Sequence, residues 1–144
     1  MTTDPTRTDA VLLDANVLIA AHFEDHVHFT VADTWLKGRR FASTPSTQGS
    51  LLRYALRITD PERAATLIDV LSENNNHEFW ADNASYRSAM LVGISGHRQL
   101  TDAYLADAAT RHNTRLVTFD ACLKALRPEV VELLRPDGSD AATQ

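Results

Sequence analysis

The sequence has almost no cysteine, since Cys122 is the only one in 144 residues. A lone cysteine excludes an internal disulfide, so we expect a reducing compartment and interpret Cys122 as a small, buried apolar residue. Long apolar runs are missing too, and the first ten residues, MTTDPTRTDA, lack the apolar segment of a secretory signal. We therefore expect a cytoplasmic protein with no membrane partner.

Positive charge is also scarce, because 14 Lys and Arg face 19 Asp and Glu, for a formal net charge of -5. A protein that binds nucleic acid by charge alone is usually basic. If this chain handles nucleic acid, it needs a metal ion, a local basic patch or a partner. The 44% hydrophobic composition fits one domain spanning residues 1–144, with a core over about residues 10–135 between polar ends.

Short apolar strands alternate with amphipathic helices along the chain. The segments with strand character are 11–13, 39–44, 77–81, 115–120 and 130–134. The segments with helical character are 16–21, 28–38, one from Pro45 capped by Thr44, one from Pro61 capped by Asp60, 101–113 and 120–126, while 84–98 is mixed helix and loop. The alternation predicts an α/β fold whose parallel sheet is covered on both faces.

The apolar run VLLDANVLIA at 11–20 contains a carboxylate, Asp14, at the point where the first strand ends. Asp120 ends the strand at 115–120 in the same way. Ligands of parallel sheets bind beyond the carboxyl ends of the strands, so we expect both acids at one edge. As an alternative, each could simply cap the helix that follows it.

Two more polar residues lie on the inward face of a helix's first turn. Leu105, Ala106 and Ala109 follow Asp102 at helical spacing, which places Asp102 on the apolar stripe, whereas Asp107 is expected on the solvated surface. Gln48 precedes the stripe of its own helix in the same way, a stripe made of Leu51, Leu52, Ala55 and Leu56. Asp102 also suits a helix start electrostatically, and Gln48 could be an ordinary first-turn residue.

Carboxylates gathered at one edge repel one another, and each rises in pKa unless a cation is present. Mg²⁺ would relieve that repulsion, because it prefers oxygen ligands, keeps several waters and takes one or two protein carboxylates. Such an ion activates water and stabilises charge on a phosphoryl oxygen.

Four motifs in order, LLDANVLIA, TQGSLLR (47–53), LTDAYLADAA (100–109) and RLVTFD (115–120), resemble the PIN-domain family, specifically its VapC-type toxin ribonucleases. The resemblance implies a three-layer α/β/α sandwich with a central, mostly parallel sheet of four to five strands. It implies metal-dependent cleavage of single-stranded or loop RNA, with Asp14 and Asp102 as Mg²⁺ ligands and Asp120 completing the acidic site. Mn²⁺ is expected to substitute for Mg²⁺. The resemblance also implies a homodimer neutralised by a cognate antitoxin protein.

The chain departs from this family at Gln48, where many members have a glutamate. An amide binds metal more weakly, which leaves open one or two metal ions, and a catalytically weak or inactive homologue that binds RNA or antitoxin. Asn16 and Thr118 lie close in sequence to Asp14 and Asp120, and we expect them to hold the carboxylates. A receiver domain and a haloacid-dehalogenase-type phosphatase fit less well, because Asn16 stands where the phosphatase needs a second aspartate.

Basic residues form one short cluster, Lys37, Arg39 and Arg40, and Arg53 lies on the helix that carries Gln48. We expect the cluster to be a solvated loop, with RNA phosphate contacts as the functional alternative. His22, His26 and His28 lack cysteine partners and are not interpreted as a zinc site.

Overall fold

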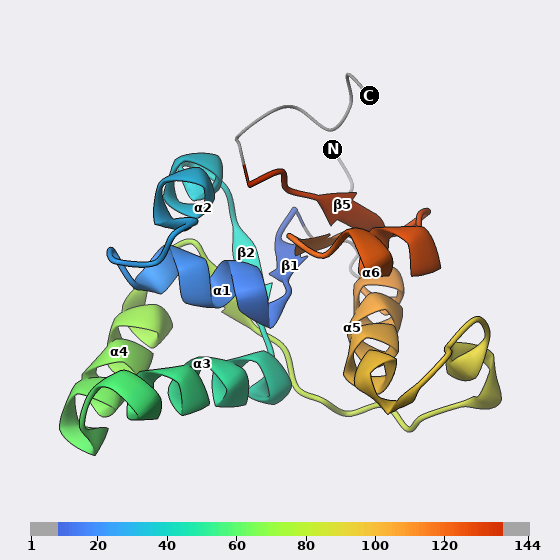
Figure 1. The fold of residues 1–144 in the computed structure, drawn as a ribbon, viewed down its shortest axis with the longest axis horizontal. Helices are drawn as coiled ribbons and strands as arrows, with labels where there is room; N and C mark the ends of the chain where they lie inside the picture. The colour runs from blue at the N-terminus through green and yellow to red at the C-terminus, as the bar shows by residue number, and fades with distance from the viewer. Residues whose placement is uncertain (1–8, 137–144) are drawn as a thin grey trace, which may run out of the picture.

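The computed structural model describes residues 9–136, and its centre is a five-stranded sheet in which every pair of neighbours is parallel (Figure 1). The strand order across the sheet is β3-β2-β1-β4-β5. The strands are β1 (Val11–Leu13), β2 (Phe41–Ser43), β3 (His77–Phe79), β4 (Leu116–Thr118) and β5 (Val131–Leu133). The predicted parallel sheet is thereby confirmed.

Six α-helices and two 3₁₀ turns surround the sheet in the described part of the chain. They are α1 (Ala15–His22), α2 (Phe29–Leu36), α3 (Pro45–Ile58), α4 (Pro61–Glu73), η1 (Ser88–Leu91), η2 (His97–Gln99), α5 (Leu100–Arg111) and α6 (Ala121–Leu126). Two helices begin as the sequence predicted: Thr44 accepts from the Thr47 backbone N–H at the start of α3, and Asp60 accepts from Arg63 at the start of α4. None of the helices within residues 9–136 is long and apolar enough to cross a membrane.

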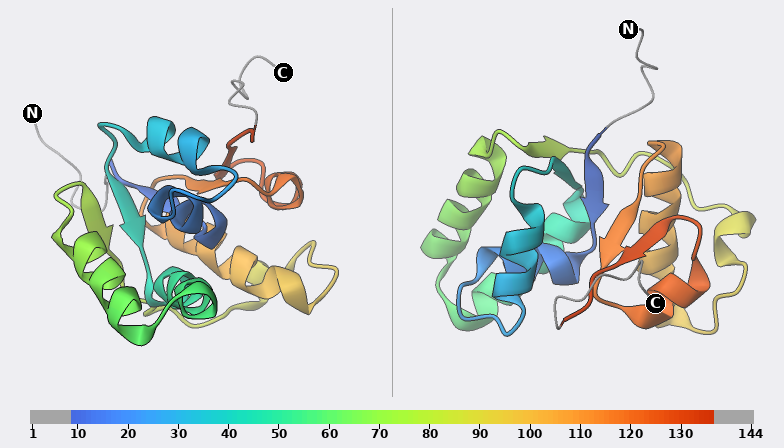
Figure 2. Two further views of the ribbon diagram at one scale, coloured as in Figure 1. Left: turned by 60° about the vertical axis from the view of Figure 1, so that its left-hand side comes forward. Right: turned by 90° about the horizontal axis from the view of Figure 1, so that it is seen from above.

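Alternate residues of the strands divide the core into two halves. Val11 and Leu13 pack with buried residues of α1 to α4 on one face, whereas Leu12 packs with those of α5 and α6 on the other. The sheet is therefore the middle layer of an α/β/α sandwich, and the two further views show helices on both of its faces (Figure 2). This confirms the predicted fold class.

The register of the central strand fixes where the chain leaves the sheet. Leu12 of β1 pairs with Ala42 of β2 on one side and with Leu116 of β4 on the other. Because these strands are parallel and aligned, their carboxyl ends lie at one edge. Helices α1, α3 and α6 begin at this edge, with only one or two residues between each helix and the strand that precedes it.

Several local predictions differ from the structure. The strands are only three residues long, and segment 84–98 holds only short 3₁₀ turns. Cys122 is exposed, not buried, because α6 turns Leu123 toward the core instead. Leu56 is 50% exposed, since only part of the predicted apolar stripe of α3 reaches the core.

Asp107 and Trp80 are tied into the fold by specific partners. Asp107 is not on the solvated surface: it is largely buried and ion-paired with Arg87 and Arg111. Trp80, just after β3, is buried, donates to Glu78 through Nε1 at 2.9 Å and stacks on His112 with ring centroids 3.7 Å apart. The stacking of Trp80 on His112 therefore joins the end of β3 to the end of α5.

The two leucines of α3 provide a test of this packing. We expect Leu51→Ala to lower the free energy of unfolding by about 2–5 kcal/mol, because Leu51 is fully buried. The matched change Leu56→Ala should cost much less, since that side chain is half exposed. Urea denaturation of both variants measures the difference, and equal losses would contradict the placement of α3.

Candidate functional site

Asp14 follows the end of β1 and is a buried acidic residue, only 8% exposed. Its extended backbone (φ -62°, ψ 154°) makes it the residue that caps α1, and one carboxylate oxygen accepts from the Ala15 N–H at 2.8 Å. The other oxygen accepts from the Thr118 hydroxyl at 2.7 Å. Capping is therefore one role of Asp14, and the Thr118 contact ties it to the neighbouring strand β4.

The Thr118 hydroxyl joins several parts of this edge. Besides donating to Asp14, its oxygen accepts from the Asn16 side-chain amide at 3.2 Å and from the Asp120 backbone N–H at 3.0 Å. Asn16 also accepts from the Phe119 backbone N–H at 3.3 Å. The structure thus places Asn16 and Thr118 where they hold the chain around Asp14 and Asp120.

Asp120 follows β4 and caps α6, because its side chain accepts from the Cys122 N–H at 2.8 Å and the Leu123 N–H at 3.4 Å. Asp102 lies in the first turn of α5 and is only partly exposed. Burial, together with the negative charges of Asp14 and Asp120, raises the pKa of Asp102 to about 6. The three carboxylates therefore share one electrostatic environment.

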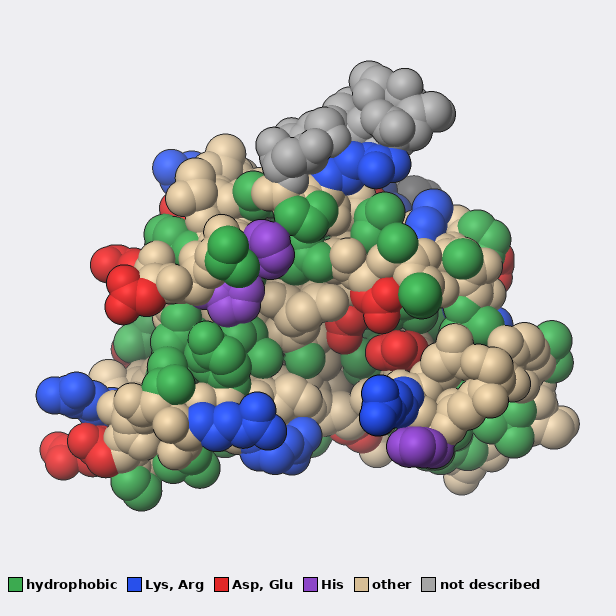
Figure 3. Space-filling view, viewed as in Figure 1, with side chains coloured by type: hydrophobic (Ala, Val, Ile, Leu, Met, Phe, Trp, Pro, Cys, Tyr) green, Lys and Arg blue, Asp and Glu red, His purple; other side chains and the backbone are tan. Residues whose placement is uncertain are grey.

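The pKa of Asp14 is raised as well, chiefly by burial and additionally by the charge of Asp120. Hydrogen bonds from Thr118 and Ala15 act in the opposite direction. In the space-filling view, acidic side chains gather near the middle of the face, between the start of α1 and the start of α5 (Figure 3). The arrangement concentrates negative charge that a cation would neutralise.

Gln48 lies in the first turn of α3, on the helix that follows β2. Its side-chain amide donates to the Ser43 hydroxyl at 3.0 Å, and Ser43 is also 2.7 Å from Nε2 of His77. Within residues 9–136, the Gln48 side chain is therefore hydrogen-bonded to Ser43 and not to any of the acidic residues. Neither Ser43 nor His77 was predicted from the sequence, although Ser43 ends its strand at the same edge as Asp14.

The basic residues divide between the two edges of the sheet. Lys37, Arg39 and Arg40 precede β2, at the edge opposite the acids. Arg39 stacks over Trp35 at 4.2 Å, and Arg40 pairs with Glu78 at 3.0 Å. These engagements do not bring the cluster to the acidic edge, and RNA contact by it stays a prediction.

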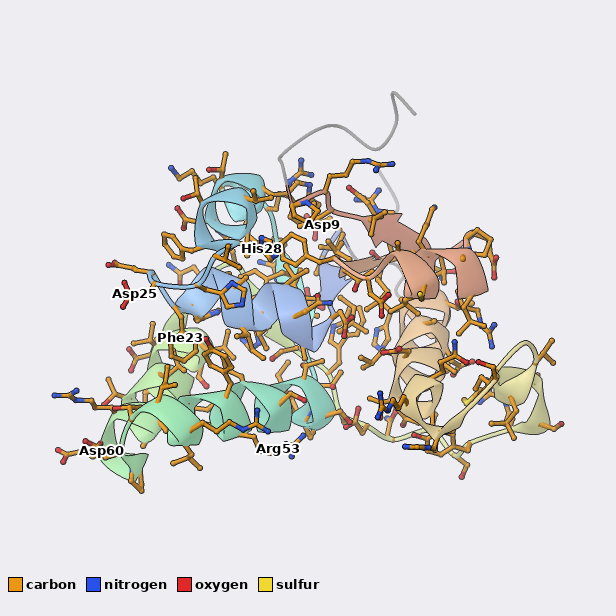
Figure 4. All side chains as sticks on the ribbon, in the orientation of Figure 1. Asp9, Phe23, Asp25, His28, Arg53 and Asp60 are labelled. Carbon is orange, nitrogen blue, oxygen red and sulfur yellow. The ribbon has the colours of Figure 1, made fainter. Side chains whose placement is uncertain are left out.

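Arg53 is exposed and lies one turn beyond Gln48 on α3, where it donates to the Ser50 hydroxyl at 3.2 Å (Figure 4). Of the four basic residues singled out in the sequence, it is the one on a helix that begins at the acidic edge.

The fit of a metal ion depends on how many carboxylates it needs. Within residues 9–136, no group of three or more His, Cys, Asp or Glu side chains is placed to hold an ion, the three histidines of residues 22–28 included. Mg²⁺ needs only one or two protein carboxylates and keeps several waters. Asp14 and Asp102 fit that requirement, with Asp120 close enough to act on both electrostatically.

Comparison with known proteins agrees with this fold. The family model described as PIN domain matches residues 11–127. Ribonuclease VapC29 of Mycobacterium tuberculosis is 44% identical over 129 residues, covering 86% of this chain and 96% of the relative. Ribonucleases VapC39 and VapC44 of the same organism are 34% and 37% identical over 78% and 76% of this chain, and 89% and 84% of their own lengths.

The match over most of the chain defines its class, a protein with the PIN fold. The chain belongs to the PIN-domain family and, by its similarity to these relatives, to the VapC group within it.

The Thr118 hydroxyl can be tested by a change that keeps its shape. We expect Thr118→Val to lower the free energy of unfolding by about 1–3 kcal/mol, because Asp14 and Asn16 each lose a hydrogen-bond partner at a buried position. Thr66→Val is the control, since Thr66 is exposed on α4. A loss in Thr118→Val no larger than in the control would contradict the role of the hydroxyl.

The raised pKa of Asp102 predicts a pH dependence of stability without divalent ions. A folded-state pKa of about 6, above the ordinary 3.8, means that the folded protein holds the proton more tightly. The resulting stability is full below the unfolded pKa and is lost as pH rises through about 6. As the pH rises from about 4 to above 6, the free energy of unfolding of wild type should therefore fall relative to that of Asp102→Asn, as measured by chemical denaturation. A constant difference between the two proteins would contradict the shift.

Proposed function

We propose that the protein is a metal-dependent endoribonuclease that cuts single-stranded or loop regions of RNA. The observation that carries the proposal is the electrostatic coupling of Asp102 to Asp14 and Asp120, two negative charges that both raise its pKa. A divalent cation would stabilise the charged form of a carboxylate that lies beside two other negative charges. In addition, the relatives at 34–44% identity are named ribonucleases.

The chemistry follows from how the chain holds its carboxylates. Asp14 and Asp102 would hold Mg²⁺ or Mn²⁺, with Asp120 acting directly or through water. When bound, the ion supplies an activated water and stabilises charge on a phosphodiester. Thr118 and Asn16 keep Asp14 fixed, so that little reorganisation is needed at the acidic edge. The N-terminal ends of α1 and α5 add a favourable field for a phosphate.

The same proposal includes the partners. The relatives carry the VapC name, and we infer a toxin that works as a cytoplasmic homodimer and is neutralised by a cognate antitoxin. Large apolar side chains exposed on α3 and α4, namely Leu56, Ile58 and Val70, offer surface for a protein partner.

A second function is favoured by Gln48 and by the lack of a three-ligand group within residues 9–136. A protein with a weak metal site would act by binding RNA or the antitoxin, without cutting. Cleavage and metal affinity separate the two functions, because a binding-only protein has no need of an ion at Asp14 and Asp102.

Cleavage of a structured RNA pool by the purified protein tests the nuclease, with Mg²⁺, with Mn²⁺ and with chelator. Residues that merely orient metal ligands contribute about 10–100-fold, so Asp14→Asn should slow cleavage by more than about 100-fold. The fold should survive, because asparagine also caps helices. Asp69→Asn, an exposed change on α4, should cut at the wild-type rate.

Full activity in Asp14→Asn would refute the assignment of Asp14. If wild type binds RNA but cuts none in either metal, the binding-only function is supported. Cleavage gained by Gln48→Glu would then identify the uncharged side chain as the reason.

A further inference from the structure

Ser43 is a fully buried hydroxyl that joins Gln48 to His77. Ser43 is the last residue of β2, Gln48 lies in the first turn of α3, and His77 begins β3. The parallel register pairs His77 with Phe41, so His77 and Ser43 project from the same face of the sheet. Three elements, β2, α3 and β3, therefore contribute one side chain each to a short hydrogen-bonded chain.

The direction of this chain follows from counting donors and acceptors. The Gln48 amide nitrogen can only donate, so the Ser43 oxygen accepts from it. The single proton of Ser43 is then left for Nε2 of His77, which must be unprotonated to accept it. A protonated Nε2 would leave the buried Ser43 proton with Gln48 Oε1 as its partner, and the amide would have to turn around.

The surroundings of His77 favour the accepting form. Burial lowers the pKa of His77, and the charge of His22 on α1 acts in the same direction. Glu78 on β3 opposes both, but it is itself paired with Arg40 of the segment preceding β2. The lowered pKa favours the neutral imidazole, and the hydrogen-bond count selects its tautomer with the proton on Nδ1, which leaves Nε2 as the acceptor for Ser43.

The orientation matters because an amide has two different ends. A glutamate at this position would present the same carboxylate either way round, but glutamine presents either a donor or an acceptor. With Nε2 on Ser43, Oε1 of Gln48 receives no hydrogen bond from the described residues. It is the only atom of the amide that can bind a cation or accept from a cation-bound water.

We propose that Ser43 and His77 are positioning residues that fix the Gln48 amide with its oxygen toward the acidic edge. The pairing of Leu12 with Ala42 places Ser43 level with Leu13, one residue before Asp14. Ser43 thus anchors Gln48 beside the end of β1. The orientation itself depends only on the hydrogen bonds, whereas its catalytic consequence rests on the proposed function.

Side-chain amide NMR of Gln48 in the metal-free, full-length protein tests the orientation directly. In wild type one amide proton should be shifted downfield and protected from exchange by Ser43. His77→Leu removes the acceptor, and the protection should disappear as the amide turns. His77→Gln supplies a carbonyl acceptor and should restore it. His112→Leu, a change at the partly buried histidine stacked on Trp80, is the control and should leave the signal unchanged.

Cleavage of a fluorophore–quencher single-stranded oligoribonucleotide in Mg²⁺ tests the consequence. Ser43→Ala and His77→Leu should lower kcat by about 10–100-fold with little change in KM, as expected for residues that orient a metal-site side chain. His77→Gln should recover most of the rate, which a general packing defect would not allow.

Two results would overturn the proposal. One is a Gln48 amide signal in His77→Leu that matches wild type. The hydrogen bonds through Ser43 and His77 would then not determine the orientation of the Gln48 amide. The other is a wild-type kcat in His77→Leu despite a turned amide, which would remove the positioning role. If wild type cuts no RNA, the proposed function fails, and the amide signal alone still decides whether Ser43 and His77 orient Gln48.

Discussion

The aligned, parallel pairing of β1 with both of its neighbours determines most of what this molecule can do. Leu12 is in register with Ala42 on one side and with Leu116 on the other, so the three strands end together. Side chains distant in the sequence meet there without any long loop to place them. Asp14 and Thr118 are 104 positions apart, and they share a hydrogen bond because their strands are neighbours.

The acidic edge is a compromise between stability and chemistry. Burial raises the pKa of both Asp14 and Asp102, which means that their charged forms are disfavoured in the folded protein. Helix caps and the Thr118 hydroxyl recover part of that cost for Asp14. The remaining strain is electrostatic, and a bound cation would relieve it at the place where a phosphodiester has to be neutralised.

The sequence alone predicted those features that depend on local spacing. The position of Asp102 came from counting turns of a helix, and the cap at Thr44 came from the proline after it. The wrong predictions concern which helix faces are covered by other elements. Cys122 and Leu56 looked buried by composition and periodicity, yet each lies on a helix face that no other element of residues 9–136 covers.

Contacts between residues that are far apart in the chain could not be predicted from the sequence. The pairing of Gln48 with Ser43 and His77 depends on the placement of β3 beside β2, which no short motif reports. Arg40 is similar, because its partner Glu78 becomes its neighbour only across that strand pair. Asp107 was assigned to the surface because it lies off the apolar stripe of its helix, and its partner Arg87 comes from an irregular segment that no periodicity places.

The double engagement of Asp14, as helix cap and as acidic residue, has an evolutionary consequence. Aspartate and asparagine codons differ by a single nucleotide, and both side chains cap helices well. A lineage could therefore lose the charge at this position in one step and still inherit an intact fold. Within such a family, catalytic silence and structural decay are separate events, and folded paralogues without activity can persist long enough to acquire other roles.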